Sequence, residues 1–288
     1  MGCQDVCPGL YYGKKPLVGA SKTAGEILEA VVEDGQSELD RASVGLALSG
    51  LAAGLNVSFG AVALAAVGAM TGGVGITAML FYPVGFLIVI LGRSQLYTEN
   101  TITPVTVVLA RLGNVPNLLR LWVVIFIANI IGATLFAAAL FYGEVLPPPA
   151  LDILLEEAAR KVDPGFWTTT LKAVFGGWLV ALIAWLVAAS RDTITQAFFI
   201  FVLAFLIPAA DLTHCIAGSS EVLVGVFSGE VSLLEYLGAF LLPTTLGNTA
   251  GGVFLVALLN YGQVAGSRSG AKTSLSGYTA EDGQREDS

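Results

Sequence analysis

Charged residues and histidine are both scarce in this 288-residue chain: Asp, Glu, Lys and Arg make up 12% of it, and His214 is the only histidine. A soluble domain carries about 25% charged residues, so the composition excludes an ordinary soluble domain. The three cysteines, Cys3, Cys7 and Cys215, lack metal-ligand spacing, so we expect no zinc site and no disulfide framework. No nucleotide-binding loop occurs, which disfavours an energised pump. No cofactor and no nucleic-acid partner is expected.

Apolar residues dominate instead, at 55% of the chain with a mean hydropathy of +0.76. A helix needs about 20 apolar residues to cross a bilayer. Six stretches meet this requirement, and their continuous rather than alternating apolar character excludes a membrane β-barrel. The sequence therefore predicts an all-α membrane protein that crosses the lipid bilayer of the cell (inner or plasma) membrane several times. The six stretches lie near 43–70, 72–110, 121–143, 173–190, 193–227 and 236–264.

The distribution of Lys and Arg predicts the orientation, because cytoplasmic loops are enriched in both. If both termini are cytoplasmic, ten of these residues lie on that side and three on the other. Residues 1–20 contain no basic stretch leading into an apolar one, so we expect no cleavable signal peptide. The ten are Lys14, Lys15, Lys22, Arg41, Arg111, Arg120, Arg191, Arg268, Lys272 and Arg285, and the three are Arg160, Lys161 and Lys172.

An internal repeat relates "NIIGATLFAAALFYG" (129–143) to "NTAGGVFLVALLNYG" (248–262). The offset is 119 residues, about half of the membrane-embedded stretch, so each repeat holds three spans and the second repeat is inverted. Inverted repeats are typical of transporters and channels, although small-residue patterns also recur where helices pack closely. The matched pairs are Asn129/Asn248, Gly132/Gly251, Ala138/Ala257, Leu140/Leu259, Tyr142/Tyr261 and Gly143/Gly262.

The middle span of each repeat is interrupted, by "LGRSQLYTEN" (91–100) in the first and "PAADLTHCIAGSSE" (208–221) in the second. Unwound backbone at membrane depth is tolerated only where protein buries it or a wet cavity receives it. The two breaks are equivalent by the repeat, so we expect them to face each other near the midplane. His214 lies in the second break, where a half-helix N-terminus attracts anions. A functional role is favoured over a neutral, packed histidine, because titratable groups inside membranes are usually functional.

These features resemble the formate–nitrite transporter family over most of residues 24–264. The stretch "YPVGFLIVILGRSQLYTEN" is similar to that family's second helix with its Ω-loop, whose core is Leu96, Tyr97 and Thr98 here. The stretch ending in His214 is similar to the fifth helix. The resemblance implies a six-helix, aquaporin-like protomer in a homo-pentamer, with one pore per protomer. It also implies small monovalent weak-acid anions as substrates, such as formate, nitrite, acetate, lactate or hydrosulfide.

The resemblance also implies the residues of the substrate pathway. His214 faces Thr98 of the Ω-loop, with apolar constrictions on either side. The chain departs from the family where Thr213 and Gly218 replace a Glu directly before the His and an Asn four residues after it. The pathway residues implied are His214, Thr98, Leu96, Tyr97, Tyr82, Phe86, Ile207, Phe205, Asn129 and Asn248.

Charged residues around the breaks are candidates for tuning the pathway. Arg93 and Glu99 are six residues apart, so either they neutralise each other or Arg93 attracts the anion. Asp211 is a candidate cap for the half-helix that begins near His214. Two residues are candidates for the vestibule lysine of the family. Lys161 is the nearer match by sequence pattern, and Lys172 is the nearer match by its position relative to the helix.

Outside the spans, "TAGEILEAVVEDG" (23–35) shows a capping box of Thr23 and Glu26 and a terminal Gly35, which predicts an amphipathic helix. Packing on the membrane surface is favoured over a gate. The predicted organisation is a cytoplasmic segment (1–40), a transmembrane domain (41–264) and a disordered cytoplasmic tail (265–288). The repeats cover about 41–143 and about 165–264, joined by an external loop over 144–165.

The predicted function is transport of small monovalent weak-acid anions, linked to a proton at His214, the only side chain whose reference pKa of about 6.5 suits proton exchange near neutrality. One alternative is a channel for a small neutral solute, although the paired Asn-Pro-Ala motifs of water channels are absent. The other is an intramembrane serine hydrolase with Ser94 and His214, although "GRSQ" lacks the second glycine of a Gly-x-Ser-Gly turn. The chain is therefore not expected to be an enzyme.

Overall fold

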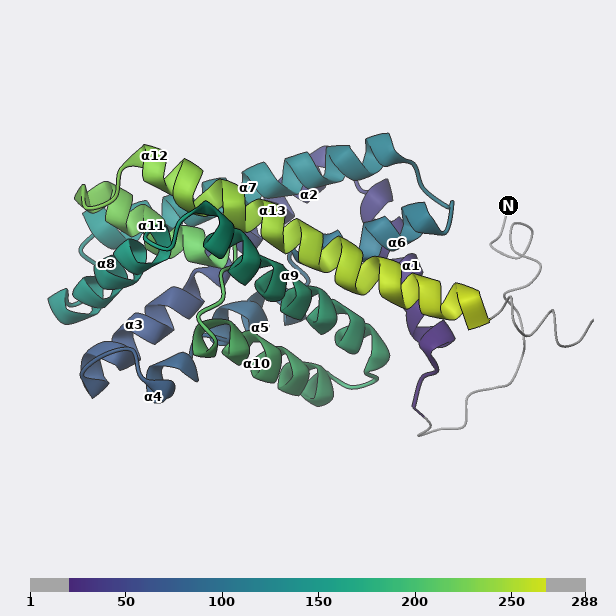
Figure 1. Ribbon diagram of the computed structural model, residues 1–288, viewed down its shortest axis with the longest axis horizontal. Helices are drawn as coiled ribbons and strands as arrows, with labels where there is room; N and C mark the ends of the chain where they lie inside the picture. Colours follow the sequence, from purple (N-terminus) through teal and green to yellow (C-terminus); the bar gives the residue numbers. More distant parts are fainter. Residues whose placement is uncertain (1–20, 268–288) are drawn as a thin grey trace, which may run out of the picture.

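The computed structural model describes residues 21–267, and within this range the secondary structure is entirely helical (Figure 1). The predicted all-α fold with six spans is confirmed. In chain order the elements are α1 (Ala24–Asp40), α2 (Ser43–Val57), α3 (Phe59–Thr71), α4 (Ile76–Met79), α5 (Val84–Leu91), η1 (Glu99–Thr101), α6 (Thr103–Leu109), α7 (Val115–Tyr142), α8 (Pro148–Val162), α9 (Phe166–Ala189), α10 (Thr193–Ala209), α11 (Ala217–Ser228), α12 (Leu233–Glu235), η2 (Tyr236–Leu241), α13 (Leu242–Ala250) and η3 (Gly251–Leu258).

Four helical stretches are long and apolar enough to cross a membrane: Ser43–Thr71, Val115–Tyr142, Phe166–Ala189 and Leu233–Ser267. The other two spans are the interrupted ones. Each begins with a shorter apolar helix, Ile76–Leu91 or Thr193–Ala209, and resumes after a loop as the short helix α6 or α11. These loops lie inside the helix bundle rather than on its rim, because Leu96, Thr98 and His214 in them are all buried. The two predicted breaks are therefore present, one in each repeat.

The molecule has two distinct ends (Figure 1). Helices α1 and α6 lie at one of them, together with both ends of the described chain, and we call this the α1 end. Helices α8 and α12 lie at the other, which we call the α8 end.

Glycines set the close packing of two equivalent helix pairs. A Cβ atom on Gly54 of α2 would overlap the backbone of Asn129 on α7, and one on Gly177 of α9 would overlap the backbone of Asn248 on α13. Small residues let membrane helices approach this closely. Because Gly54–Asn129 and Gly177–Asn248 occupy matching places in the two halves, the inverted repeat is visible in the packing itself.

Three features at the ends differ from the prediction. The capping box of Thr23 and Glu26 is present, but α1 continues to Asp40, and Gly35 lies inside it against the carbonyl of Thr103. The glycine therefore allows α1 to approach α6 and does not end the helix. The predicted external loop is largely helix α8. The last span stays helical to Ser267, whose hydroxyl donates to Gln263 O, so the predicted tail begins later than 265. Residues 268–288 lie outside the described chain.

Candidate functional site

Asn129 of α7 holds the first broken loop in place. Its side-chain oxygen accepts a hydrogen bond from the Tyr97 amide (2.8 Å), and its side-chain nitrogen donates to Gln95 O (2.9 Å) and Gly50 O (2.7 Å). The residue is fully buried. Unwound backbone inside a membrane protein must find hydrogen-bond partners, and this one amide provides them on both sides of Leu96.

Asn248 of α13 does the same for the second broken loop. Its oxygen accepts from the Cys215 amide (2.9 Å), and its nitrogen donates to Thr213 O (3.0 Å) and Ala173 O (2.7 Å). The two clamps make Leu96 and His214 equivalent by the repeat, since each lies between the two clamped backbone groups. Asn129 and Asn248 were predicted in the pathway. The structure shows that each amide bonds the backbone of its loop at two points and one carbonyl of a neighbouring helix, Gly50 O of α2 or Ala173 O of α9.

The centre of the candidate site is a contact between the two broken loops. His214 Nε2 lies 2.7 Å from Thr98 Oγ1. The histidine is 1% exposed and the threonine is fully buried. The structure thus joins the two residues that the sequence predicted to face each other, one from each repeat.

The other ring nitrogen of His214 caps helix α11. His214 Nδ1 accepts the backbone amides of Ile216 (3.2 Å) and Ala217 (3.1 Å). Because Nδ1 accepts both, we assign the ring proton of neutral His214 to Nε2, which donates to Thr98 Oγ1. Asp211 was predicted to cap this helix, and that prediction is wrong. Its side chain instead pairs with Arg160 and Lys172, because α11 begins six residues after Asp211, beyond its reach.

Aromatic rings pack next to His214. Phe86 meets the imidazole edge to face with ring centres 5.1 Å apart, and Tyr82 packs against Phe86 at 5.9 Å. A cavity of about 10 Å³ lies on the α8 side of this stack, and Tyr82, Ile207 and His214 are among its lining residues. This volume corresponds to about one water molecule. Phe205 is partly exposed and lines neither this cavity nor the larger one at the α1 end, unlike Ile207.

A larger cavity of about 170 Å³ opens at the α1 end. Arg93 and Glu99 both line it. No ion pair within 4.0 Å joins them in the described chain, so the two charges do not neutralise each other by direct contact. Glu38 reaches the loop from α1 and accepts hydrogen bonds from Thr103 Oγ1 (2.7 Å) and Gln95 Nε2 (3.4 Å). Burial raises the pKa of Glu38 to about 7, although these two hydrogen bonds act to lower it. Helix α1 therefore docks on the Ω-loop through a carboxyl group.

Two predicted residues face away from His214. Tyr97 packs edge to face against Phe126 and its hydroxyl bonds Thr249 Oγ1 (2.8 Å), so it fastens the first loop to α13. Ser94 lines the α1-end cavity, whereas His214 lines the α8-end one. Both ring nitrogens of His214 are engaged elsewhere, so the Ser–His pair of the hydrolase alternative is not assembled.

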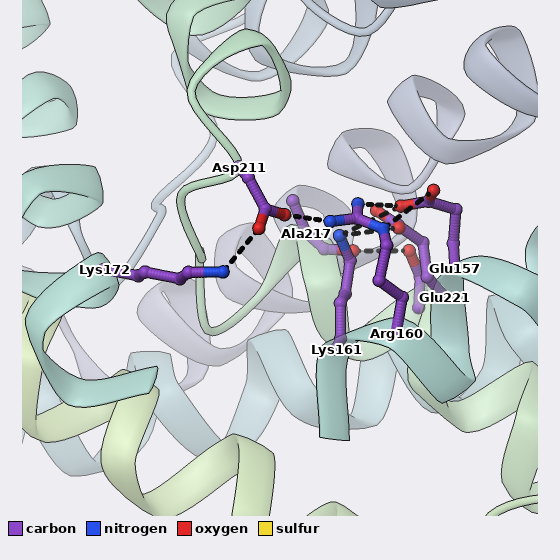
Figure 2. A network of polar contacts seen from close by, with 8 residues as sticks. Glu157, Arg160, Lys161, Lys172, Asp211, Ala217 and Glu221 are labelled. Atoms are coloured by element: carbon purple, nitrogen blue, oxygen red, sulfur yellow. Dashed lines mark hydrogen bonds and ion pairs between the residues drawn. The ribbon is translucent and has the colours of Figure 1, made fainter. Parts of the chain in front are cut away.

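Charged side chains gather at the α8 end (Figure 2). Lys161 lines the cavity beside His214, whereas Lys172 pairs with Asp211. Of the two candidate vestibule lysines, Lys161 is therefore the one that shares a cavity lining with His214. Glu157 was missed as a site residue. Its spacing to Arg160 and Lys161, three and four residues on, is the signal of a helical ion-pair cluster, and it pairs with both.

Two inverted repeats, with loops that meet at a buried His–Thr contact between two cavities, define a multi-pass membrane transport protein of aquaporin-like architecture. Residues 25–262 match the family "Formate/nitrite transporter". The chain belongs to this family, whose members are transporters and channels, so it is not an enzyme. The resemblance seen in the sequence is confirmed.

Two relatives and one solved structure illustrate the similarity. The chain is 32% identical to "Inner membrane protein YfdC" of Escherichia coli (strain K12), over 88% of this chain and 83% of that protein. It is 30% identical to "Probable formate transporter" of Methanothermobacter thermautotrophicus, over 64% and 74% of the respective chains. The solved "Pentameric formate channel with formate bound" matches with a TM-score of 0.67 at 17% identity, over 76% of this chain and 96% of that one. This last likeness shows the shared fold.

Proposed function

We propose that the protein transports small monovalent anions of weak acids, with formate and nitrite as the first candidates. The contact between His214 Nε2 and Thr98 Oγ1 carries this proposal, because it places two buried polar groups beside the apolar ring of Phe86, where the two loops meet. The similarity to a probable formate transporter and to a formate channel supports the substrate class.

The apolar walls explain why a weak acid suits this pathway. Phe86, Leu96 and Ile207 are 2% exposed or less. Moving a bare anion past such walls costs several kcal/mol or more, because nothing replaces its hydration. A weak acid avoids this cost by crossing with a proton. Transport linked to a proton follows from the chemistry of the substrate.

His214 steers the proton in this mechanism. Its Nε2–H donates to Thr98 Oγ1, which leaves the threonine hydroxyl hydrogen free to donate to the substrate. Protonating the ring at Nδ1 would break its two bonds to the amides of Ile216 and Ala217. The histidine therefore orients Thr98 and the substrate, while the proton itself travels on the substrate.

Uptake into liposomes tests this function. We expect protein-dependent uptake of formate and nitrite that rises as the outside pH falls, because the protonated form is the one that crosses. Chloride, whose acid is fully dissociated, is the control and should enter at least about tenfold more slowly, a difference of about 1.4 kcal/mol in barrier. Glycerol uptake with no anion uptake would favour the neutral-solute alternative and contradict the proposal.

We propose that five protomers assemble in the cell membrane with both termini in the cytoplasm, so that the α1 end is inside and the α8 end outside. The pentameric structural relative and the charge asymmetry support this. Cysteines introduced one at a time at Glu33 and Ala159, with Cys3 and Cys7 changed to serine and the buried Cys215 kept, should react with an impermeant reagent from opposite sides. Native mass spectrometry should give five chains per particle. Labelling of both sites from one side, or a stable monomer, would contradict this arrangement.

A further inference from the structure

Six charged side chains form a closed network at the α8 end (Figure 2). Arg160 pairs with Glu157 and Asp211, and Lys172 pairs with Asp211. Lys161 lies between two carboxylates, 3.6 Å from Glu157 and 3.1 Å from Glu221. Three cations thus face three carboxylates. When all six are ionised, the network is neutral and every one of its cations already has an anionic partner, so it offers little attraction to an anion.

Glu221 differs from the other two carboxylates. It lies on α11 inside the bundle, is 1% exposed, and lines the α8-end cavity together with His214 and Lys161. Neither of its oxygens has an aligned hydrogen-bond partner in the described chain. Its one ion pair there is the contact with Lys161. A buried charge held by one partner and no aligned hydrogen bonds is poorly compensated.

The other carboxylates are held more firmly in the ionised form. Burial opposes ionisation of Glu157, but Lys161 and Arg160 outweigh it and keep the pKa of this carboxyl below its ordinary value. Asp211 is half exposed and has two cations beside it. A proton that reaches this network is therefore bound by Glu221.

Few other titratable groups face Glu221. Besides the three α8 residues, the cavity brings Tyr82 and His214 close to it. Helix α3 contains no titratable residue. Helix α7 carries only Arg120, bound at the α1 end to Leu39 O, and Tyr142, which packs on Phe227. From η2, Tyr236 bonds Ser219 rather than Glu221.

We propose that Glu221 is the proton-binding residue of this pathway and that its carboxylate occupies the place on Lys161 that a substrate anion takes. When Glu221 binds a proton it becomes neutral, and Lys161 keeps only its longer contact with Glu157 (3.6 Å). One anion can then pair with Lys161 and restore neutrality. The proton next passes from the Glu221 carboxyl to the substrate, which leaves as the neutral acid past Phe86, and the Glu221 carboxylate returns to Lys161.

This inference rests on the proposed function, and it gives a source for the proton that His214 is not placed to supply. The α8-end cavity holds about one water molecule at most. A formate or nitrite ion therefore enters by replacing the Glu221 carboxylate on Lys161, not by filling an empty space. Competition of two anions for one ammonium makes anion binding depend on proton binding.

Replacing Glu221 by glutamine tests the proposal in liposomes. Because one proton is bound per anion, uptake by the unaltered protein should rise by up to about tenfold per pH unit of outside acidification. The E221Q protein keeps the shape but binds no proton, so its uptake should vary less than about twofold across the same range. The E221D protein keeps a titrating carboxyl and should retain the rise. Glu156→Gln, an exposed change on the same helix, should behave like the unaltered protein.

Calorimetry on the unaltered protein provides a measurement that needs no variant. Formate binding, followed in two buffers of different ionisation enthalpy, should take up close to one proton per anion. Binding without proton uptake, or an E221Q protein with the full pH dependence, would overturn the role of Glu221 while leaving anion transport intact. If the unaltered protein transports no weak-acid anion, the proposed function itself fails.

Discussion

Replacing His214 by phenylalanine is expected to lower formate and nitrite uptake at least about tenfold at every pH, an increase of about 1.4 kcal/mol or more in the barrier. The phenyl ring removes the donor to Thr98 Oγ1 and leaves the amides of Ile216 and Ala217 without their acceptor. Both effects alter the buried contact at which the two loops meet, beside the apolar ring of Phe86. The measurement is initial uptake into liposomes with matched protein content.

A second change at His214 separates its two roles. In His214→Asn, the amide oxygen can still accept backbone amides two and three residues on, as asparagine does in Asx turns and helix caps, but it does not reach Thr98. The His214→Asn protein should fold like the unaltered protein and transport as poorly as the His214→Phe protein. Ser94→Ala should leave uptake unchanged. If His214→Asn transports normally, the imidazole serves only as a helix cap.

The Asn248→Ala protein is expected to lose about 3 kcal/mol or more of stability. The change removes three hydrogen bonds and leaves the buried Cys215 amide and the Thr213 carbonyl of the loop without a partner, and each unsatisfied buried group costs about 1–3 kcal/mol. The midpoint of thermal unfolding in detergent should fall by about 10 °C. Asn129→Ala should behave alike, because Asn129 makes the equivalent three bonds.

Asn260→Ala is the matched control for this effect. Asn260 lies in the same final span but is partly exposed, and within residues 21–267 its side chain bonds only Val256 O of its own helix. Its loss should change stability by less than about 0.5 kcal/mol, as for most surface substitutions. Equal melting temperatures for the Asn248→Ala and unaltered proteins would show that the loops hold their shape without the clamp.

Much of the fold follows from patterns that the sequence carries locally. Six apolar runs predict six spans, and the matched Asn129 and Asn248 reveal the repeat. What these asparagines do is not local, because their partners lie in loops more than thirty residues away along the chain. Gly35 shows the same limit. A glycine after an amphipathic stretch predicts the end of a helix. Here it instead allows close packing against α6, which is remote in the sequence.

The site is predictable where two signals coincide and less so elsewhere. His214 and Thr98 were paired by the breaks and by the family resemblance, and the structure brings them together. Asp211 was misassigned because capping depends on where α11 starts, which the break alone does not reveal. The sequence placed Glu221 near a break, but its partner Lys161 comes from a helix predicted as loop, so their pairing needed the tertiary structure.

The contacts between the two broken loops also bear on how the molecule moves. His214 bonds Thr98, Tyr97 bonds Thr249, and Gly252 sits against the side chain of Thr101, so the two repeats interlock at their centre. Many transporters with inverted repeats expose their site alternately by rocking one half against the other. In this protein such rocking would break the contacts between the two repeats. On the proposed pathway, passage then depends on rotation of single side chains such as Phe86, motions far faster than the microsecond-to-millisecond swing of whole domains. We therefore propose that dehydration of the anion and arrival of the proton set the turnover.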